Sequence, residues 1–144
     1  MLGRLLLGFG LGLALSLPPV SADEAGLSEA DRRSIRGVIE SQLQAFRRND
    51  AALAFSFAAP GIREKFGTPE NFMTMVRTGY PAVYRPREVE FRGLRRPGRE
   101  PVQEVLFVGP DGAPVLALYA MQRQPDGSWR INGVYMLDAP DEMI

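Results

Sequence analysis

The spacing of apolar residues changes once along this chain, close to Pro81. Before that proline, apolar side chains recur every three or four residues, which is typical of amphipathic helices. After it they alternate with polar ones, as in "REVEFRGL", which is typical of strands with one buried face. Helices first and strands second, with no alternation of the two, predict an α+β domain.

The longest predicted helix runs from Glu29 to Arg48. Ser28 followed by Asp31 resembles a capping box with Asp in place of Glu. The apolar residues that follow recur at helical spacing and predict one buried face. These residues are Ile35, Val38, Ile39, Leu43 and Phe46.

Shorter helices are expected between this helix and Pro81. A helix over 51–58 would place Leu53 and Phe57 four residues apart on one face. Thr68 as cap and a proline at the first helical position predict a further helix that stops at Gly79. The buried face of that helix is expected to hold Phe72, Met75 and Val76.

The segments "RRPGREP", "GPDGAP" and "QPDGSW" carry turn signals that divide the rest of the chain into about four strands. We therefore expect N-terminal helices packed on a curved antiparallel sheet. The strand over 115–123 is apolar on both faces, so it should be central and covered on each side. Curvature of the sheet, a loop or another subunit could supply the second cover, and an apolar sheet face of this kind favours a homodimer.

The last strand, "DGSWRINGVYML", alternates apolar and polar positions and contains the only tryptophan. Gly133 within it predicts a bulge or a close approach where the sheet bends, which would open a cavity under the helices. Strict alternation would place five residues on one face: Trp129, Ile131, Gly133, Tyr135 and Leu137.

Residues 1–22 have the order of a secretory signal peptide, with a basic start, a short apolar run, two prolines and small residues. Cleavage near Ala22 would leave a single mature domain, 23–144, in the periplasm or outside the cell, with no stable membrane anchor. The alternative is an uncleaved anchor, but the apolar run is shorter than the roughly 20 residues that span a bilayer.

The composition excludes several function classes. The chain has no His and no Cys, so it offers no Cys/His zinc site, no Ser-His-Asp triad and no thiol nucleophile. The formal net charge is zero, which does not suggest a nucleic-acid partner. No glycine-rich phosphate loop is present, so no nucleotide cofactor is expected, and no metal is expected either. Only Lys65 is a lysine; the other basic residues are arginines, as a GC-rich genome would also produce.

The segment "GYPAVYRPREV" is the most unusual in the chain, because two tyrosines and an arginine lie between prolines where helix gives way to sheet. Rigid backbone and amphipathic rings suit the rim of a small apolar pocket, but they equally suit a well-packed corner. The candidate ligand-binding residues, from this segment and from the strands, are Tyr80, Tyr84, Arg85, Tyr119 and Trp129.

Proton chemistry would have to rest on carboxylates and tyrosines. Glu88, Glu90 and Glu104 are candidates by location only, because acids that alternate with apolar residues on strands generally face water. A buried acid within hydrogen-bond reach of a tyrosine hydroxyl would indicate catalysis. No catalytic residue is assigned.

The string "AFSFAAPGIREKFGTPENFMTMVRTGYPAVYRPREVEF" resembles the signature of an exported bacterial family known as domain of unknown function 4864 (DUF4864). More distantly, the order of elements and the closing strand resemble the nuclear-transport-factor-2-like cone of the cystatin-like superfold. This second resemblance implies a pocket between helices and sheet, and members of that superfold include ketosteroid isomerase as well as domains that only bind or dimerise.

Three hypotheses about function follow. The first is a non-catalytic binding or accessory domain whose pocket takes a small apolar molecule, or which binds a protein partner. The second is a cofactor-free isomerase or lyase of the ketosteroid-isomerase type. The third is a structural or dimerisation module without a pocket.

Overall fold

The computed structural model describes residues 26–138, which form five helices followed by four strands. The predicted signal peptide lies outside the described residues. The order of elements confirms the α+β prediction, and no helix within residues 26–138 has the length and apolar character needed to cross a membrane. The helices are α2 Glu29–Arg47, α3 Ala51–Ser56, α4 Pro60–Phe66, α5 Pro69–Gly79 and α6 Pro81–Tyr84, and the strands are β1 Glu88–Arg95, β2 Val102–Val108, β3 Pro114–Arg123 and β4 Trp129–Asp138.

The predicted helix signals are found where expected. Ser28 and Asp31 form the capping box at the start of α2, and the Thr68 side chain accepts a hydrogen bond from the Asn71 amide at the start of α5. Helix α3 ends at Ser56, two residues before the predicted end at 58. Leu53 is 40% exposed, whereas Ala54 and Phe55 are buried, because α3 packs against α5.

The segment after Pro81 was predicted to be strand and turn, but Pro81–Tyr84 forms the short helix α6. Proline suits the first helical position, because its fixed φ matches the helix and its missing amide hydrogen has no partner there. Ala82 and Val83 are buried in this turn, so α6 closes the gap between α5 and the sheet.

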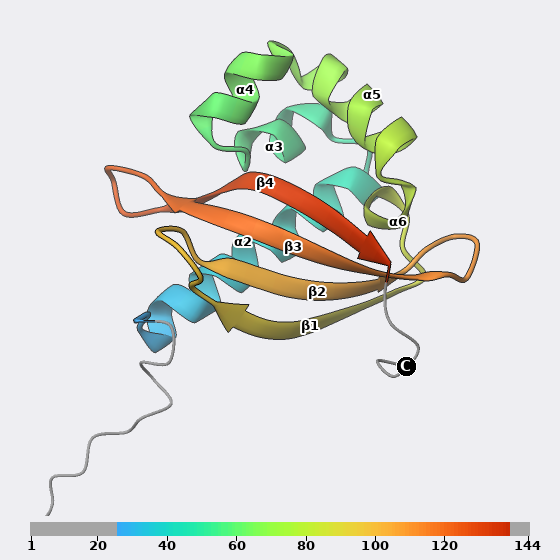
Figure 1. The fold of residues 1–144 in the computed structure, drawn as a ribbon. Coiled ribbons are helices and arrows are strands. Elements are labelled where there is room, and N and C mark those ends of the chain that lie inside the picture. The colour runs from blue at the N-terminus through green and yellow to red at the C-terminus, as the bar shows by residue number, and fades with distance from the viewer. Residues whose placement is uncertain (1–25, 139–144) are drawn as a thin grey trace, which may run out of the picture.

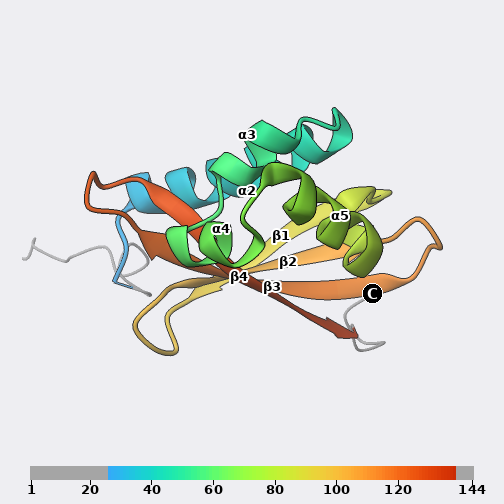
Figure 2. The ribbon, with the colours of Figure 1, turned by 90° about the horizontal axis from the view of Figure 1, so that it is seen from above.

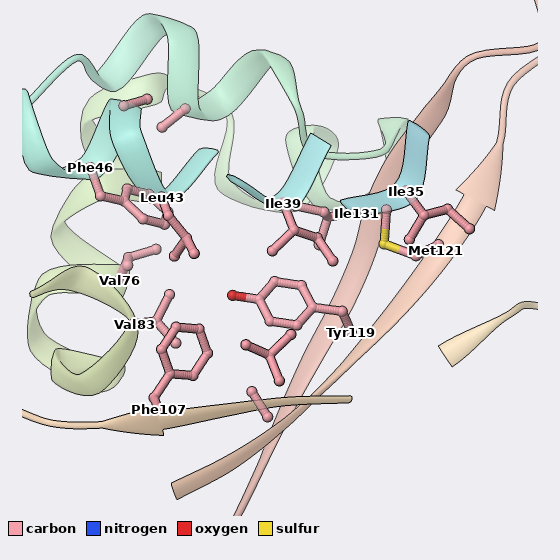
Figure 3. Close-up of a cluster of buried hydrophobic side chains, with 14 of the residues drawn as sticks. Ile35, Ile39, Leu43, Phe46, Val76, Val83, Phe107, Tyr119, Met121 and Ile131 are labelled. Atoms are coloured by element: carbon pink, nitrogen blue, oxygen red, sulfur yellow. The ribbon is translucent and has the colours of Figure 1, made fainter. Parts of the chain in front are cut away.

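The four strands form an antiparallel meander in the order β1-β2-β3-β4. The helices lie on one face of this twisted sheet, as the two ribbon views show (Figures 1 and 2). The long helix α2 supplies Ile35, Ile39, Leu43 and Phe46 to the core. In Figure 3 these side chains face Phe107, Tyr119 and Met121 of the sheet.

A β-bulge in β4 changes which of its side chains face the helices. Met121 pairs with Ile131 and Ala120 pairs with Gly133, so Asn132 is the extra residue. The predicted strict alternation is therefore wrong beyond Ile131, since the bulge reverses the faces. Trp129, Ile131, Val134 and Met136 face the helices, whereas Gly133, Tyr135 and Leu137 face the other way.

The predicted irregularity at Gly133 is confirmed, and a neighbouring side chain explains why a glycine stands at this position. A Cβ atom added to Gly133 would lie 3.3 Å from the Tyr135 hydroxyl oxygen, because the Tyr135 ring lies over this residue on the outer face of the sheet. Glycine therefore leaves room for the ring beside the bulge.

The outer face of the sheet carries a continuous set of apolar side chains. β3 lies between β2 and β4 as predicted, but within residues 26–138 no helix covers its outer side. Leu116 and Leu118 are only partly buried there, and Tyr135 and Leu137 are 63% and 50% exposed. The described part of the chain therefore leaves the outer side of β3 uncovered, and cover by another subunit stays a prediction.

The hydroxyl of Tyr119 lies in the core between α2 and the sheet (Figure 3). It is fully buried and has no hydrogen-bond partner within residues 26–138. Burial raises the pKa of Tyr119, so the group stays neutral. A buried polar group without a partner costs folding free energy.

We expect Tyr119→Phe to raise the free energy of unfolding by about 1 kcal/mol, because it removes this buried hydroxyl and keeps the ring. Tyr135→Phe makes the same change at an exposed position and should alter stability by less than about 0.5 kcal/mol. Urea denaturation followed by circular dichroism measures both. A clear loss of stability in Tyr119→Phe would contradict the absence of a partner.

Candidate functional site

An apolar pocket of about 350 Å³ lies between the helices and β4, the edge strand that carries the bulge. Pockets of this size accept small organic ligands. Its apolar lining comes mainly from α4, α5, α6 and β4, and comprises Phe46, Ala58, Ile62, Phe66, Phe72, Met75, Val76, Val83, Ile131 and Val134. The bulge contributes directly, because it turns Val134 toward the helices.

Two polar side chains in the pocket wall already have partners. The Gln42 amide is buried and donates a hydrogen bond of 3.0 Å to the Ala54 carbonyl, which ties α2 to α3. The Tyr80 hydroxyl donates a hydrogen bond of 3.3 Å to the Val134 carbonyl in β4. These bonds fix the shape of the wall, because each joins a helix or its cap to another element.

Lys65 and Asn132 also line the pocket. The Asn132 amide donates a hydrogen bond of 3.1 Å to the Glu100 carboxylate, outside the apolar part. Lys65 is exposed, and its Nζ atom lies 5.5 Å from the centre of the Phe66 ring. The only lysine of the chain therefore lies at the pocket, where its ammonium group is available to a ligand.

Of the five residues predicted to bind ligand, Tyr80 lines this pocket. Tyr84 and Arg85 lie at the corner where α2 ends. Arg85 donates a hydrogen bond of 2.6 Å to the Phe46 carbonyl, and both residues donate to the Asn49 side chain. Asn49 has a φ of 56°, so this contact holds a left-handed residue at the end of α2.

Tyr119 and Trp129 also lie away from the pocket lining. Tyr119 is in the centre of the core. Trp129 is buried at the other end of the sheet, where its ring lies 4.5 Å below the Arg123 guanidinium and its Nε1 donates a hydrogen bond to Asp31. The structure thus places the five residues in four separate environments rather than around one cavity.

The three acids considered for proton chemistry lie on the outer face of the sheet. Glu88 and Glu90 are exposed, and Glu90 forms an ion pair with Arg92. The Glu104 side chain is 18% exposed and is 3.0 Å from Arg95. Within residues 26–138, no Asp or Glu lines the apolar pocket.

Sequence reasoning missed several pocket residues whose signal was partly visible. Ile62 and Phe66 lie four residues apart, and this spacing puts them on one face of α4. Met75 and Val76 were predicted to be buried, but not to line a pocket. Val134 could not be found from alternation, because the bulge moves it to the inner face.

Comparison with known proteins places the chain in a family. The family model described as "Domain of unknown function (DUF4864)" matches residues 28–144. The chain belongs to the DUF4864 family. A search of solved structures found a protein titled as an "NTF-2 like protein of unknown function" from Burkholderia xenovorans LB400, with 17% sequence identity and a TM-score of 0.44 over 77% of this chain and 91% of that one. A search of the curated proteins found no match.

Asp31 connects the start of α2 with the β3–β4 hairpin in this DUF4864 protein. Its carboxylate accepts hydrogen bonds from the Ser28 amide, from Arg123 at 2.6 Å and from Trp129 at 3.4 Å. Partial burial alone would raise the pKa of Asp31, but the hydrogen bonds from Ser28, Arg123 and Trp129 outweigh it and hold the pKa below its ordinary value. The folded state therefore favours the ionised carboxylate.

We expect Asp31→Asn to lower the free energy of unfolding at neutral pH by about 1 kcal/mol. The pKa of Asp31 is lower in the folded state than in the unfolded state. The ionised carboxylate therefore stabilises the fold at pH values above the unfolded-state pKa, and this stabilisation is lost as the pH falls through the folded-state pKa. The difference between wild type and variant should shrink on acidification below about pH 4. Thermal melting across this range measures it, with Glu64→Gln on exposed α4 as the control for charge.

Proposed function

We propose that this DUF4864 protein is an exported, non-catalytic binding protein that holds a small apolar molecule in the pocket beside β4. The observation that carries the proposal is the pocket itself, with about 350 Å³ of space and a mainly apolar lining. The third hypothesis, a structural module without a pocket, is less well supported for this reason.

Binding is better supported than catalysis by the placement of charge. An isomerase of the ketosteroid-isomerase type would need a carboxylate next to a tyrosine hydroxyl in the pocket. The pocket lining within residues 26–138 contains Tyr80 and Tyr135 but no carboxylate, and the Tyr80 hydroxyl is bonded to the Val134 carbonyl. Lys65 offers a positive charge at the pocket, suited to orienting the polar end of an apolar ligand.

Export is proposed from the sequence of residues 1–22, which has the order of a cleavable leader. Helix α2 starts at Glu29 with its own capping box, so the domain needs no structural contribution from the leader to begin its first helix.

A second copy of the chain is the partner proposed for the outer face of the sheet. The apolar side chains of β2, β3 and β4 lie together there, with Leu116 opposite Leu137 and Leu118 opposite Tyr135. Pairing two such faces around a twofold axis would remove Leu137 and Tyr135 from water in both copies. Burial of apolar surface is the driving force for this contact.

The pocket is tested with Nile red, a neutral apolar dye that fluoresces more strongly when it leaves water. We expect the purified protein to bind the dye, and Ile62→Trp to weaken binding roughly tenfold or more, because the indole would fill the pocket from the α4 side. Leu53→Trp places the same ring on the exposed side of α3 as a control. Equal binding by wild type and Ile62→Trp would refute the pocket as the site.

The dimer is tested by sedimentation velocity of the protein and of Leu137→Glu. We expect wild type to sediment as a dimer and the variant as a monomer, because a carboxylate would be buried without a partner at the paired faces. Leu53→Glu changes an equally exposed leucine on the helical side and should remain dimeric. A monomeric wild type would disprove this part of the proposal.

A further inference from the structure

A second cleft lies at the opposite end of α2 from the apolar pocket, and its lining is strongly basic. It has a volume of about 700 Å³ and lies between the first turns of α2 and the end of β1. Figure 1 shows the start of α2 beside this end of the sheet. Among the described residues, one acid lines the cleft, Glu29, together with six arginines: Arg32, Arg33, Arg36, Arg92, Arg95 and Arg96.

Local structure brings these arginines together from two directions. Arg32 and Arg36 lie one helical turn apart on α2, and Arg36 stacks at 4.5 Å over the Phe91 ring of β1. The register of β1 is irregular between Phe91 and Leu94. Gln103, which is 5% exposed, fills this irregularity by donating hydrogen bonds to the carbonyls at 92 and 93. The basic wall of β1 is therefore fixed by buried contacts.

The arginines of the cleft are only partly neutralised. Arg36, Arg92 and Arg95 form ion pairs with Glu40, Glu90 and Glu104. Within residues 26–138, no carboxylate pairs with the other three arginines, which are Arg32, Arg33 and Arg96.

Arg32 gives a second, independent indication that a ligand completes the cleft. Its Nη2 atom is buried and has no hydrogen-bond acceptor within residues 26–138. A buried guanidinium nitrogen without an acceptor is costly, and such a group calls for an acceptor from beyond the described residues. The chain as a whole is neutral, so a local excess of positive charge here is a feature of this face and not of the composition.

We propose that this cleft binds the phosphate group of an anionic ligand, independently of the apolar pocket. Guanidinium groups donate two parallel hydrogen bonds to phosphate oxygens, and a phosphate offers enough oxygens to accept from several arginines at once. Its charge can approach minus two at neutral pH, which suits the three arginines that have no carboxylate partner within residues 26–138. The phosphate belongs either to a soluble phosphorylated molecule or to a lipid headgroup.

The proposal is tested with two phosphate probes on the purified protein. Isothermal titration calorimetry with inorganic pyrophosphate represents the soluble ligand. Co-sedimentation with vesicles of equal parts phosphatidylglycerol and phosphatidylcholine represents the headgroup, with pure phosphatidylcholine vesicles as the neutral reference. We expect binding to at least one phosphate probe, weakened by added salt, and a loss of roughly tenfold or more in the double variant Arg32→Gln/Arg33→Gln.

Helix α2 provides a matched control, because it carries a second pair of adjacent arginines at its other end. Arg47→Gln/Arg48→Gln removes the same charge outside the cleft and should change the affinity less than about twofold. If Arg32→Gln/Arg33→Gln does not fold, Arg96→Gln, at an exposed position of the cleft, supplies the same comparison. The proposal is overturned if neither phosphate probe binds, or if both double variants lose affinity equally.

Discussion

Two backbone hydrogen bonds at Ile131 join the helical layer to the sheet, and the rest of the site depends on them. The Ile131 amide donates to the Phe57 carbonyl, and the Ala59 amide donates to the Ile131 carbonyl, each at 2.8 Å. They occupy part of the free edge of β4, which would otherwise present unpaired groups. The chain between α3 and α4 is thereby held against the strand, and Ala58 and Ile131 both become part of the pocket wall. The bulge follows at the next residue, so one short stretch of β4 both anchors the helices and opens the space beneath them.

Local signals in the sequence predicted most of the fold, because the interactions that make them are themselves local. The Ser28 cap bonds a residue three positions away, and Thr68 does the same. The bounds of α2 and α5 follow from these caps and from the residues that end the helices. The faces of β4 could not be predicted in this way. The extra residue at Asn132 exists only in relation to the pairing with β3, and alternation within one strand carries no information about its partner.

The candidate site was less predictable, since an aromatic ring with a polar tip suits several environments. Tyr84 finds its partner at Asn49, and Trp129 finds its partner at Asp31, almost a hundred residues earlier in the chain. The Tyr84 contact lies at the C-terminal end of α2 and the Trp129 contact lies at its N-terminal end. Neither contact can be predicted from the sequence around the aromatic residue. Tyr80 is the exception, because it follows α5 directly and that helix forms one wall of the pocket. The high arginine content could also result from a GC-rich genome, so it did not predict a site. Only the folded structure shows that six of the arginines line one cleft.

The two cavities lie toward opposite ends of α2, and the core between them decides how they relate. Arg32 lines one and Phe46 the other, about 21 Å apart along a helix that rises 1.5 Å per residue. Ile35, Ile39 and Leu43 fill the face of the helix between them and are almost completely buried against the sheet. A single amphiphile with its phosphate in the basic cleft and its apolar part in the pocket would have to displace these side chains, at a cost of several kcal/mol for cavity formation in the core. The geometry therefore favours two separate ligands, and α2 serves each site with a different part of its length.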